Sequence, residues 1–272
     1  MCRWRFFYRT IGVLCILWLL MAACSSVPFT ERKQLNLIPA ASMLSMSYQQ
    51  YEQVLEKAKL SDDKEKTRMV KRVGRRIQEA VEQYFDRQGE TQRLENYKWE
   101  FKLVESDQVN AWALPGGKVV VYTGILPVAR TENGLAVIMG HEVAHAVARH
   151  GNERMSQSML AQFGSVALSQ VMQEKPEQTR QLWMMAYGLG AQVGLILPYS
   201  RLHEKEADHL GLIFMAMAGY DPHAAVDFWQ RMAEKKEGKA PPEFLSTHPA
   251  DQTRIAAIKE LMPKAMSYYK KN

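Results

Sequence analysis

Cysteine is scarce in this chain of 272 residues, and none occurs after Cys24. The other two, Cys2 and Cys15, lie near the N-terminus. The rest of the chain can therefore form no disulfide and can offer no thiolate to a metal ion. Internal repeats and low-complexity tracts are also lacking, which excludes a repeat architecture.

The net charge of the chain is small once the N-terminal residues are left out. The formal net charge is +6, but the first 23 residues contain three arginines and no acidic residue, so the remainder carries +3. This small basic excess argues against nucleic acid as the main partner. The length and a hydrophobic content of 47% suit one globular domain that follows a leader.

The N-terminus has the pattern of an export signal. Its arginines precede an apolar run, Ile11–Leu20, which is short for a membrane span. The sequence Met21-Ala22-Ala23-Cys24 resembles a bacterial lipobox, although Met21 departs from the usual small aliphatic residue. We therefore expect a lipoprotein signal peptide at 1–23, lipidation of Cys24 and a membrane tether at 24–41. An uncleaved anchor and ordinary signal-peptidase cleavage are the alternatives.

Residues 42–272 are expected to form one α+β domain, mostly helical, with a small β-sheet. Strands are predicted by apolar alternation, and helices by apolar residues three and four positions apart. The expected strands lie around 99–103, 110–114 and 118–123. The expected helices are 42–59, 63–88, 132–150, 156–171, 182–197 and 201–217, one capped by Asp221-Pro222, and one running from His248-Pro249 to Leu261.

Gly151 is expected to end the helix that starts at Glu132, since glycine favours the position after a helix. The stretch Leu182–Leu197 carries no charge. We expect it to be a buried or partly exposed helix near the active site.

The sequence His141-Glu142-Val143-Ala144-His145 is the most informative motif. It reads H-E-x-x-H within a predicted helix, where residues four apart share one face. Two imidazoles can therefore hold one metal ion, while the glutamate between them reaches a water on that ion. A catalytic zinc site needs a third protein ligand.

The third ligand is expected to be Glu204. His150 lies nine residues after His141, about half a turn away from the metal-facing side, and is expected at the surface. Glu204 and Asp208 are four apart, so both can point at one spot from a second helix. Asp208 would accept a hydrogen bond from a ligand imidazole and fix its tautomer. Glu206 is expected to be solvated, and His203 to point elsewhere.

Three blocks of sequence resemble the H-E-x-x-H gluzincin metallopeptidases of family forty-eight. They are 110–117 with 121–124, Gly140–His145, and Ser200–Asp208. The family includes HtpX, the CAAX prenyl endopeptidases and compact periplasmic lipoproteins of the LoiP, YcaL and BepA type, to which this chain is expected to be closest. The resemblance implies a zincin-like fold with an active-site helix. It also implies one Zn²⁺ per chain on His141, His145 and Glu204, with Glu142 as general base.

The resemblance also draws attention to His248 and Arg254. In relatives the matching residues lie near the zinc. The histidine is then either a transition-state stabiliser or a fourth ligand that silences the resting site. In the expected mechanism, His248 or Arg254 stabilises the developing oxyanion. The strand around Asn110, Ala111, Trp112 and Ala113 is expected to pair with an extended substrate by strand addition. Trp112 fits the core as well as a substrate platform.

The expected function is zinc-dependent proteolysis of misfolded or misassembled envelope proteins. The location expected from Ser25, by resemblance to Gram-negative lipoproteins, is the periplasmic face of the outer membrane, with the outer-membrane assembly machinery as a possible partner. One alternative is a chaperone or assembly factor that rarely cuts. A zinc hydrolase of cell-wall material lacks any sign of a sugar groove, and a purely structural lipoprotein leaves Glu142 and Glu204 unexplained.

Overall fold

The computed structural model describes residues 24–28, 30–236 and 242–269. By its contacts the chain divides into two compact units. The first comprises the N-terminal residues up to Ser42 together with Arg149–Ser200. The second comprises Met43–Ala148 and Arg201–Asn272, and it contains the H-E-x-x-H motif.

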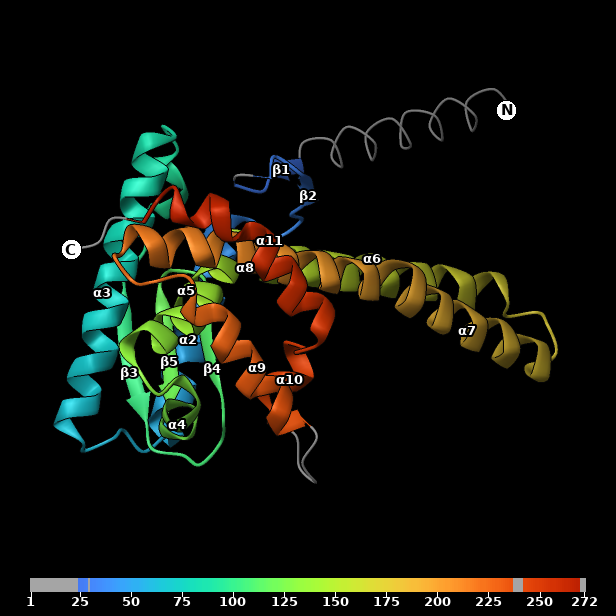
Figure 1. The fold of residues 1–272 in the computed structure, drawn as a ribbon. Helices are drawn as coiled ribbons and strands as arrows, with labels where there is room; N and C mark the ends of the chain where they lie inside the picture. Colours follow the sequence, from blue (N-terminus) through green and yellow to red (C-terminus); the bar gives the residue numbers. More distant parts are fainter. Residues whose placement is uncertain (1–23, 29, 237–241, 270–272) are drawn as a thin grey trace. The chain divides into compact units, whose positions relative to one another are not determined.

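The first unit joins a small strand pair to a helical hairpin. Strands β1 (Cys24–Ser26) and β2 (Lys33–Leu35) pair antiparallel. Helix α6 (His150–Val171) runs alongside α7 (Glu177–Ala191), as Figure 1 shows. A π-helical segment, η3 (Gln192–Ile196), continues α7 toward α8 (Leu197–Met217). The predicted signal peptide at 1–23 lies outside the described residues, and lipidation of Cys24 stays a prediction.

The second unit is built on a three-stranded mixed sheet of order β3-β5-β4. Strand β3 (Glu100–Val104) pairs parallel with β5 (Lys118–Tyr122), which pairs antiparallel with β4 (Ala111–Leu114). The hairpin between β4 and β5 turns at Gly116 and Gly117, whose φ angles of 89° and 81° favour glycine. The three expected strands are confirmed.

Helices α2 (Ala40–Lys57), α3 (Lys64–Arg87) and α5 (Glu132–Val147) pack around the sheet. An apolar stripe on α3 is fully buried and consists of Val70, Val73, Ile77 and Val81. On the same helix, Gly74 lets the ring of Phe101 on β3 approach closely. On α2, Tyr51 packs with Val104 and Val120. The remaining elements of the second unit, apart from α8, are η1 (Thr91–Leu94), η2 (Thr123–Ile125), α4 (Leu126–Ala129), α9 (Ala224–Lys236), α10 (Phe244–Thr247) and α11 (Gln252–Met266).

Three expected helix ends are wrong. Helix α5 ends at Val147 and not at Gly151, which lies inside α6. Between the two helices, Arg149 takes the left-handed conformation (φ 59°). The Asp221 carboxylate accepts a hydrogen bond from the His223 amide, and α9 begins only at Ala224. The last helix begins at Gln252 rather than His248, because Asp251 caps it by accepting from the Arg254 amide at 2.8 Å.

The stretch Leu182–Leu197, expected to be a buried or partly exposed helix, is largely exposed. Leu182, Met185, Leu189 and Val193 are all more than 60% exposed. None of the helices in the described part of the chain has the length and apolarity needed to cross a membrane.

Candidate metal centre

Four buried side chains of the second unit converge: His141, His145, Glu204 and His248. One potential ligand atom from each lies within 4.8 Å of all the others. Within the described residues this is the group that could hold a metal ion. The two histidines of the motif and the distant carboxylate are thus brought together as the sequence predicted, and His248 joins them.

The helix that carries the motif is fixed at its start and along its length. Thr131 caps α5 by accepting a hydrogen bond from the Gly134 amide. Further along, Gly140 of α5 meets Gly211 of α8. A Cβ at Gly140 would lie 2.9 Å from the Gly211 carbonyl oxygen, and a Cβ at Gly211 would lie 2.9 Å from the His141 amide nitrogen. Two helical turns before Gly211 on α8, Glu204 places its carboxylate oxygens 3.4 Å from Nε2 of His141 and 3.3 Å from Nε2 of His145.

The distances within the group suit a cation. The Nε2 atom of His141 lies 3.1 Å from Nε2 of His145 and 3.2 Å from Nδ1 of His248. Glu204 places its carboxylate oxygens 3.0–3.4 Å from the three imidazoles. A neutral imidazole bonded to a carboxylate through one N–H turns the lone pair of its other nitrogen outward. Converging lone pairs and a carboxylate form a donor set that fits a divalent metal ion.

Asp208 orients the first of these imidazoles. Its Oδ1 lies 3.0 Å from Nδ1 of His141, opposite the nitrogen that enters the group. Arg254 donates to both oxygens of the same carboxylate and also lies 3.0 Å, through Nη1, from Glu204. The Asp208 side chain thus lies where the sequence predicted, behind a ligand histidine.

The charges in this site shift the pKa values of its members. Burial alone lowers the pKa of His141, but hydrogen bonds with Asp208 and Glu204 raise it to about 9. Burial raises the pKa of Asp208, but the charge of Arg254 and the bond with His141 hold it below its usual range. Burial likewise opposes ionisation of Glu204, and hydrogen bonds from three imidazoles hold its pKa far below the usual range. Both carboxylates therefore stay ionised.

Glu142 is buried beside the four converging side chains, and one of its carboxylate oxygens forms no hydrogen bond with them. Its Oε1 has no hydrogen-bond partner among the described residues, and Nε2 of His248 lies 3.4 Å from it. An unsatisfied buried carboxylate oxygen is costly, and it persists where a function requires it. The oxygen is positioned to accept a proton or a hydrogen bond from a water molecule at the centre.

His248 reaches the group from the end of α10. The ring of Phe244 stacks on it with centroids 4.5 Å apart. The amide of Phe244 donates to the Val109 carbonyl at 3.4 Å, which ties α10 to the segment before β4. Nδ1 of His248 lies 3.0 Å from both oxygens of Glu204.

Strand β4 packs against α5, the helix that carries the motif, and is an edge strand of the described sheet. Within that sheet it pairs with β5 alone. Ala111 is buried, while Asn110 and Ala113 are half-buried. Trp112 packs edge-on against Tyr51 and donates to the Tyr122 hydroxyl at 3.3 Å, so it belongs to the core.

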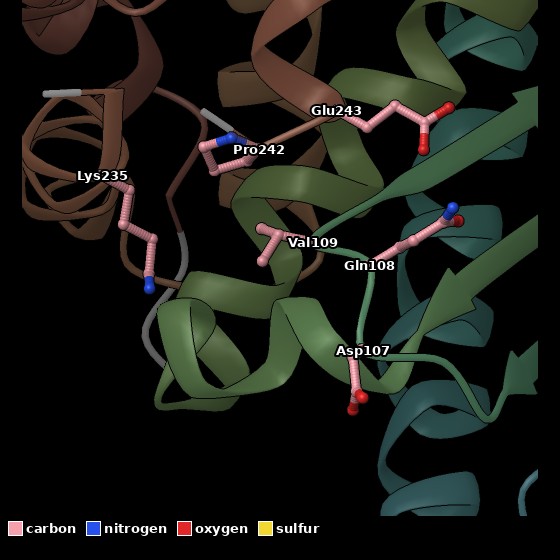
Figure 2. A pocket seen from close by; sticks show the side chains of 6 residues that line it. All are labelled: Asp107, Gln108, Val109, Lys235, Pro242 and Glu243. Atoms are coloured by element: carbon pink, nitrogen blue, oxygen red, sulfur yellow. The ribbon is translucent and has the colours of Figure 1, made fainter. Parts of the chain in front are cut away.

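A pocket of about 290 Å³ opens near the start of β4, and its lining contains none of the four converging residues. Figure 2 shows Asp107, Gln108 and Val109 on one side and Lys235, Pro242 and Glu243 on the other. The pocket therefore adjoins the segment that leads into α10 and is separate from the metal centre.

Two expectations about neighbouring residues are wrong, and one residue was missed. His150 and Glu206 are fully or nearly buried (0% and 2% exposed) instead of lying at the surface. His203 is outside the converging group, as expected. The missed residue is Trp229, which was not among the predicted site residues. Its side chain is buried, its ring contacts His141 edge-on, and the Arg254 guanidinium lies 3.4 Å from the ring centre. No motif marks it, since it follows Phe228 on an ordinary apolar helix face.

Comparison with known proteins agrees with this geometry. Residues 71–262 match the model of peptidase family M48. The chain belongs to this family. The matched span contains every residue of the site from His141 to Arg254, so the expected family and the mostly helical fold with a small sheet are confirmed.

The relatives come from mitochondria and from bacteria. Mitochondrial metalloendopeptidase OMA1 of Schizosaccharomyces pombe is 40% identical over 174 residues, covering 63% of this chain and 49% of that protein. The human metalloendopeptidase OMA1 is 30% identical over 246 residues, or 88% of this chain and 46% of that protein. The beta-barrel assembly-enhancing protease of Yersinia pestis is 32% identical over 164 residues, 57% and 33% of the two chains. The chain thus spans about half the length, or less, of these relatives.

Proposed function

We propose that this chain is a zinc-dependent metalloendopeptidase that cleaves misfolded or misassembled proteins of the cell envelope. One observation carries the proposal: His141, His145 and Glu204 converge from two helices, with the unsatisfied carboxylate of Glu142 beside them. Membership of a peptidase family supports it, and so do the OMA1 relatives, which are named as metalloendopeptidases.

In this proposal His141, His145 and Glu204 hold the zinc ion. When bound, zinc would act as a Lewis acid that lowers the pKa of a coordinated water toward about 7 and polarises the scissile carbonyl. Glu142 takes the proton of the attacking water and passes it to the leaving amine. Oε1 of Glu142 has no other hydrogen-bond partner among the described residues, so it is available for this transfer.

His248 is proposed to act as a fourth ligand that restrains the site. Its Nδ1 lies among the ligand atoms, at distances like those of the other two histidines. A catalytic zinc needs one coordination position free for water. Displacement of His248 would free that position, and its movement would be coupled to α10 and the segment before β4. The alternative, transition-state stabilisation by His248, requires the ring to leave Glu204 first.

Arg254 is proposed as a positioning residue. Its guanidinium binds Asp208 and Glu204, donates to the Pro249 carbonyl at 3.1 Å and stacks on Trp229. These contacts occupy its donors. It therefore supports the ligands instead of stabilising an oxyanion as the sequence suggested.

The substrate is proposed to bind as an extended strand along β4, near Asn110, Ala111, Trp112 and Ala113. The free edge of β4 offers backbone groups for pairing, which selects unfolded chains by backbone shape. A periplasmic, outer-membrane location rests on the lipobox-like sequence that ends at Cys24. The name of the Yersinia pestis relative supports a link to β-barrel assembly.

The test is metal analysis and casein hydrolysis by the purified full chain, with and without chelator. We expect one zinc per chain, loss of hydrolysis on chelation, and recovery on adding zinc back. Glu142→Gln should keep the zinc and lose hydrolysis. Hydrolysis by Glu142→Gln at the wild-type rate would refute the assignment of the base. Rescue of an envelope-assembly defect by Glu142→Gln would favour the chaperone alternative.

A further inference from the structure

The helical hairpin of the first unit exposes an unusual amount of apolar surface. On α6 the large exposed side chains are Met155, Leu160, Phe163, Val166 and Val171, between 36% and 74% exposed. At 100° per residue these five positions fall within one half of the helix circumference. The other half packs on α7: Tyr187 donates to the Ala161 carbonyl at 2.9 Å and its ring covers Gly164.

Helix α7 and the π-helical segment repeat the pattern. Leu182, Met185, Leu189 and Val193 are 63–67% exposed and recur at spacings of three and four residues, so they form one stripe. Trp183 lies next to this stripe and is 52% exposed. Of the 13 large apolar residues exposed in the described chain, 11 belong to 155–197. A surface that faces only water rarely concentrates its apolar side chains in this way.

Charge is missing from the same surfaces. No Asp, Glu, Lys, Arg or His occurs from Met155 to Gln173 or from Gln181 to Ser200. The charged residues and the histidine of the hairpin lie instead at its two ends: His150, Glu153 and Arg154 at the start of α6, and Glu174, Lys175, Glu177 and Arg180 at 174–180. Moving a charge into a lipid environment is costly, so the face of a helix that enters a bilayer is expected to lack charge.

The N-terminal segment is fastened to the base of this hairpin. Arg32 donates through both Nη atoms to Glu153 of α6, at 2.8 and 2.7 Å. The Leu37 amide donates to Ser156 at 2.9 Å, and Asn152 donates to the Ile38 carbonyl at 2.7 Å. This segment begins at Cys24, four residues after the end of the apolar run 11–20. Cleavage with lipidation and retention of an uncleaved anchor both place residue 24 at a membrane, whereas ordinary signal-peptidase cleavage would leave it without an attachment.

We propose that the α6–α7 hairpin binds the surface of a phospholipid bilayer through these two apolar stripes, next to the N-terminal attachment point. This inference goes beyond the proposed proteolysis and does not depend on it. A lipid surface suits the stripes better than a second copy of the chain does. A protein interface is expected to include a polar rim, whereas these helices are free of charge over their apolar lengths. Gly188, Gly190 and Gly194 also have open space beside them, with no neighbouring side chain fitted to them.

The test uses cysteine labelling of the full chain, which has no cysteine after Cys24. Val166→Cys, Leu189→Cys and the control Glu79→Cys, on exposed α3, each receive an environment-sensitive fluorophore. The chain without an added cysteine gives the background from the N-terminal cysteines. The labelled proteins are reconstituted in vesicles of phosphatidylethanolamine and phosphatidylglycerol that contain doxyl-labelled lipid, which quenches only fluorophores in contact with the bilayer. Circular dichroism checks that each variant is folded.

Quenching at positions 166 and 189, with a blue shift in emission and little quenching at position 79, is the expected result. Equal quenching at all three positions, or none at 166 and 189, would overturn the proposal. Disulfide cross-linking between chains at Leu189→Cys, without lipid quenching, would identify a second copy as the occupant and would also overturn it. Because no readout is proteolytic, its outcome is independent of whether the chain cleaves casein.

Discussion

Arg254 and Asp208 form a two-point ion pair behind the metal centre. Nε of Arg254 lies 2.9 Å from one carboxylate oxygen and Nη2 lies 2.7 Å from the other. The second of these oxygens also contacts Nδ1 of His141 at 3.0 Å. One carboxylate thus connects α11 to a ligand on α5, and the first predictions concern this connection.

Asp208→Asn should weaken metal binding. An amide can present its NH₂ group to His141 and no longer carries the charge that favours the ligand tautomer. Loss of such a supporting carboxylate costs about 10–100-fold in metal affinity. Competition with a chromophoric chelator measures this change. Asp227→Asn, an exposed change on α9, is the control, and equal affinity in the two variants would show that Asp208 does not orient His141.

Arg254→Ala should destabilise the fold as well as the site. Removing one partner from a buried ion pair leaves a charge without compensation, at a cost of about 3–5 kcal/mol. Arg254→Lys keeps the positive charge but cannot form the two-point pair with Asp208. We expect it to recover only part of the lost free energy of unfolding. Denaturant unfolding of the metal-free chain measures both, with exposed Lys259→Ala as the control. A lysine variant as stable as the parent would show that the paired geometry is unimportant.

His248→Ala should raise the kcat/KM for casein. Removing the imidazole frees a coordination position that water needs, while His141, His145 and Glu204 remain. The matched control is His223→Ala, on an exposed side chain in contact with Asp221. A fall in activity with unchanged zinc content would instead assign His248 to transition-state stabilisation, and an unchanged rate would exclude both roles.

Gly211→Ala should destabilise the chain by about 1–3 kcal/mol, because its Cβ would push against the backbone of α5 at His141. The same strain should separate α5 from α8 and weaken metal binding. Gly188→Ala provides the control, since its Cβ would meet open space and alanine favours a helix by up to about 1 kcal/mol. Thermal unfolding and metal titration of both variants test the contact, and two equally stable variants would contradict it.

Metal affinity should rise with pH between about 6.5 and 9. The pKa of His141 in the metal-free chain is raised to about 9, so the imidazole carries a proton at neutral pH. A metal ligand must be deprotonated, so binding releases that proton and is favoured as the pH approaches 9. Calorimetry in buffers of different ionisation enthalpy counts the proton. Binding at neutral pH without proton release would contradict the raised pKa.

The local patterns of the sequence were sufficient for much of the site. The spacing of His141 and His145, and of Glu204 and Asp208, follows from the helical repeat alone, and the structure places all four side chains as that repeat requires. Alternation likewise predicted strands β3, β4 and β5, because strand side chains alternate between two faces whatever their partners.

The errors arose where burial depends on which element packs opposite. His150 and Glu206 are polar and were expected in water, yet both are buried. Leu182–Leu197 is apolar and was expected to be buried or partly exposed, and most of its large side chains are 45–67% exposed. The composition of a helix indicates whether its faces favour burial or contact with water. It does not state which neighbour, if any, covers them.

The sequence by itself determined the chemistry of this protein: two imidazoles four apart, a glutamate between them, and a carboxylate pair on a later helix. Only the tertiary structure decided how these meet. The close crossing of α5 and α8 at Gly140 and Gly211, the ion pair from Arg254 on α11, the stacking on Trp229 and the entry of His248 all join residues far apart in the chain. Helical periodicity acts over a few residues, whereas these contacts exist only after the helices have packed.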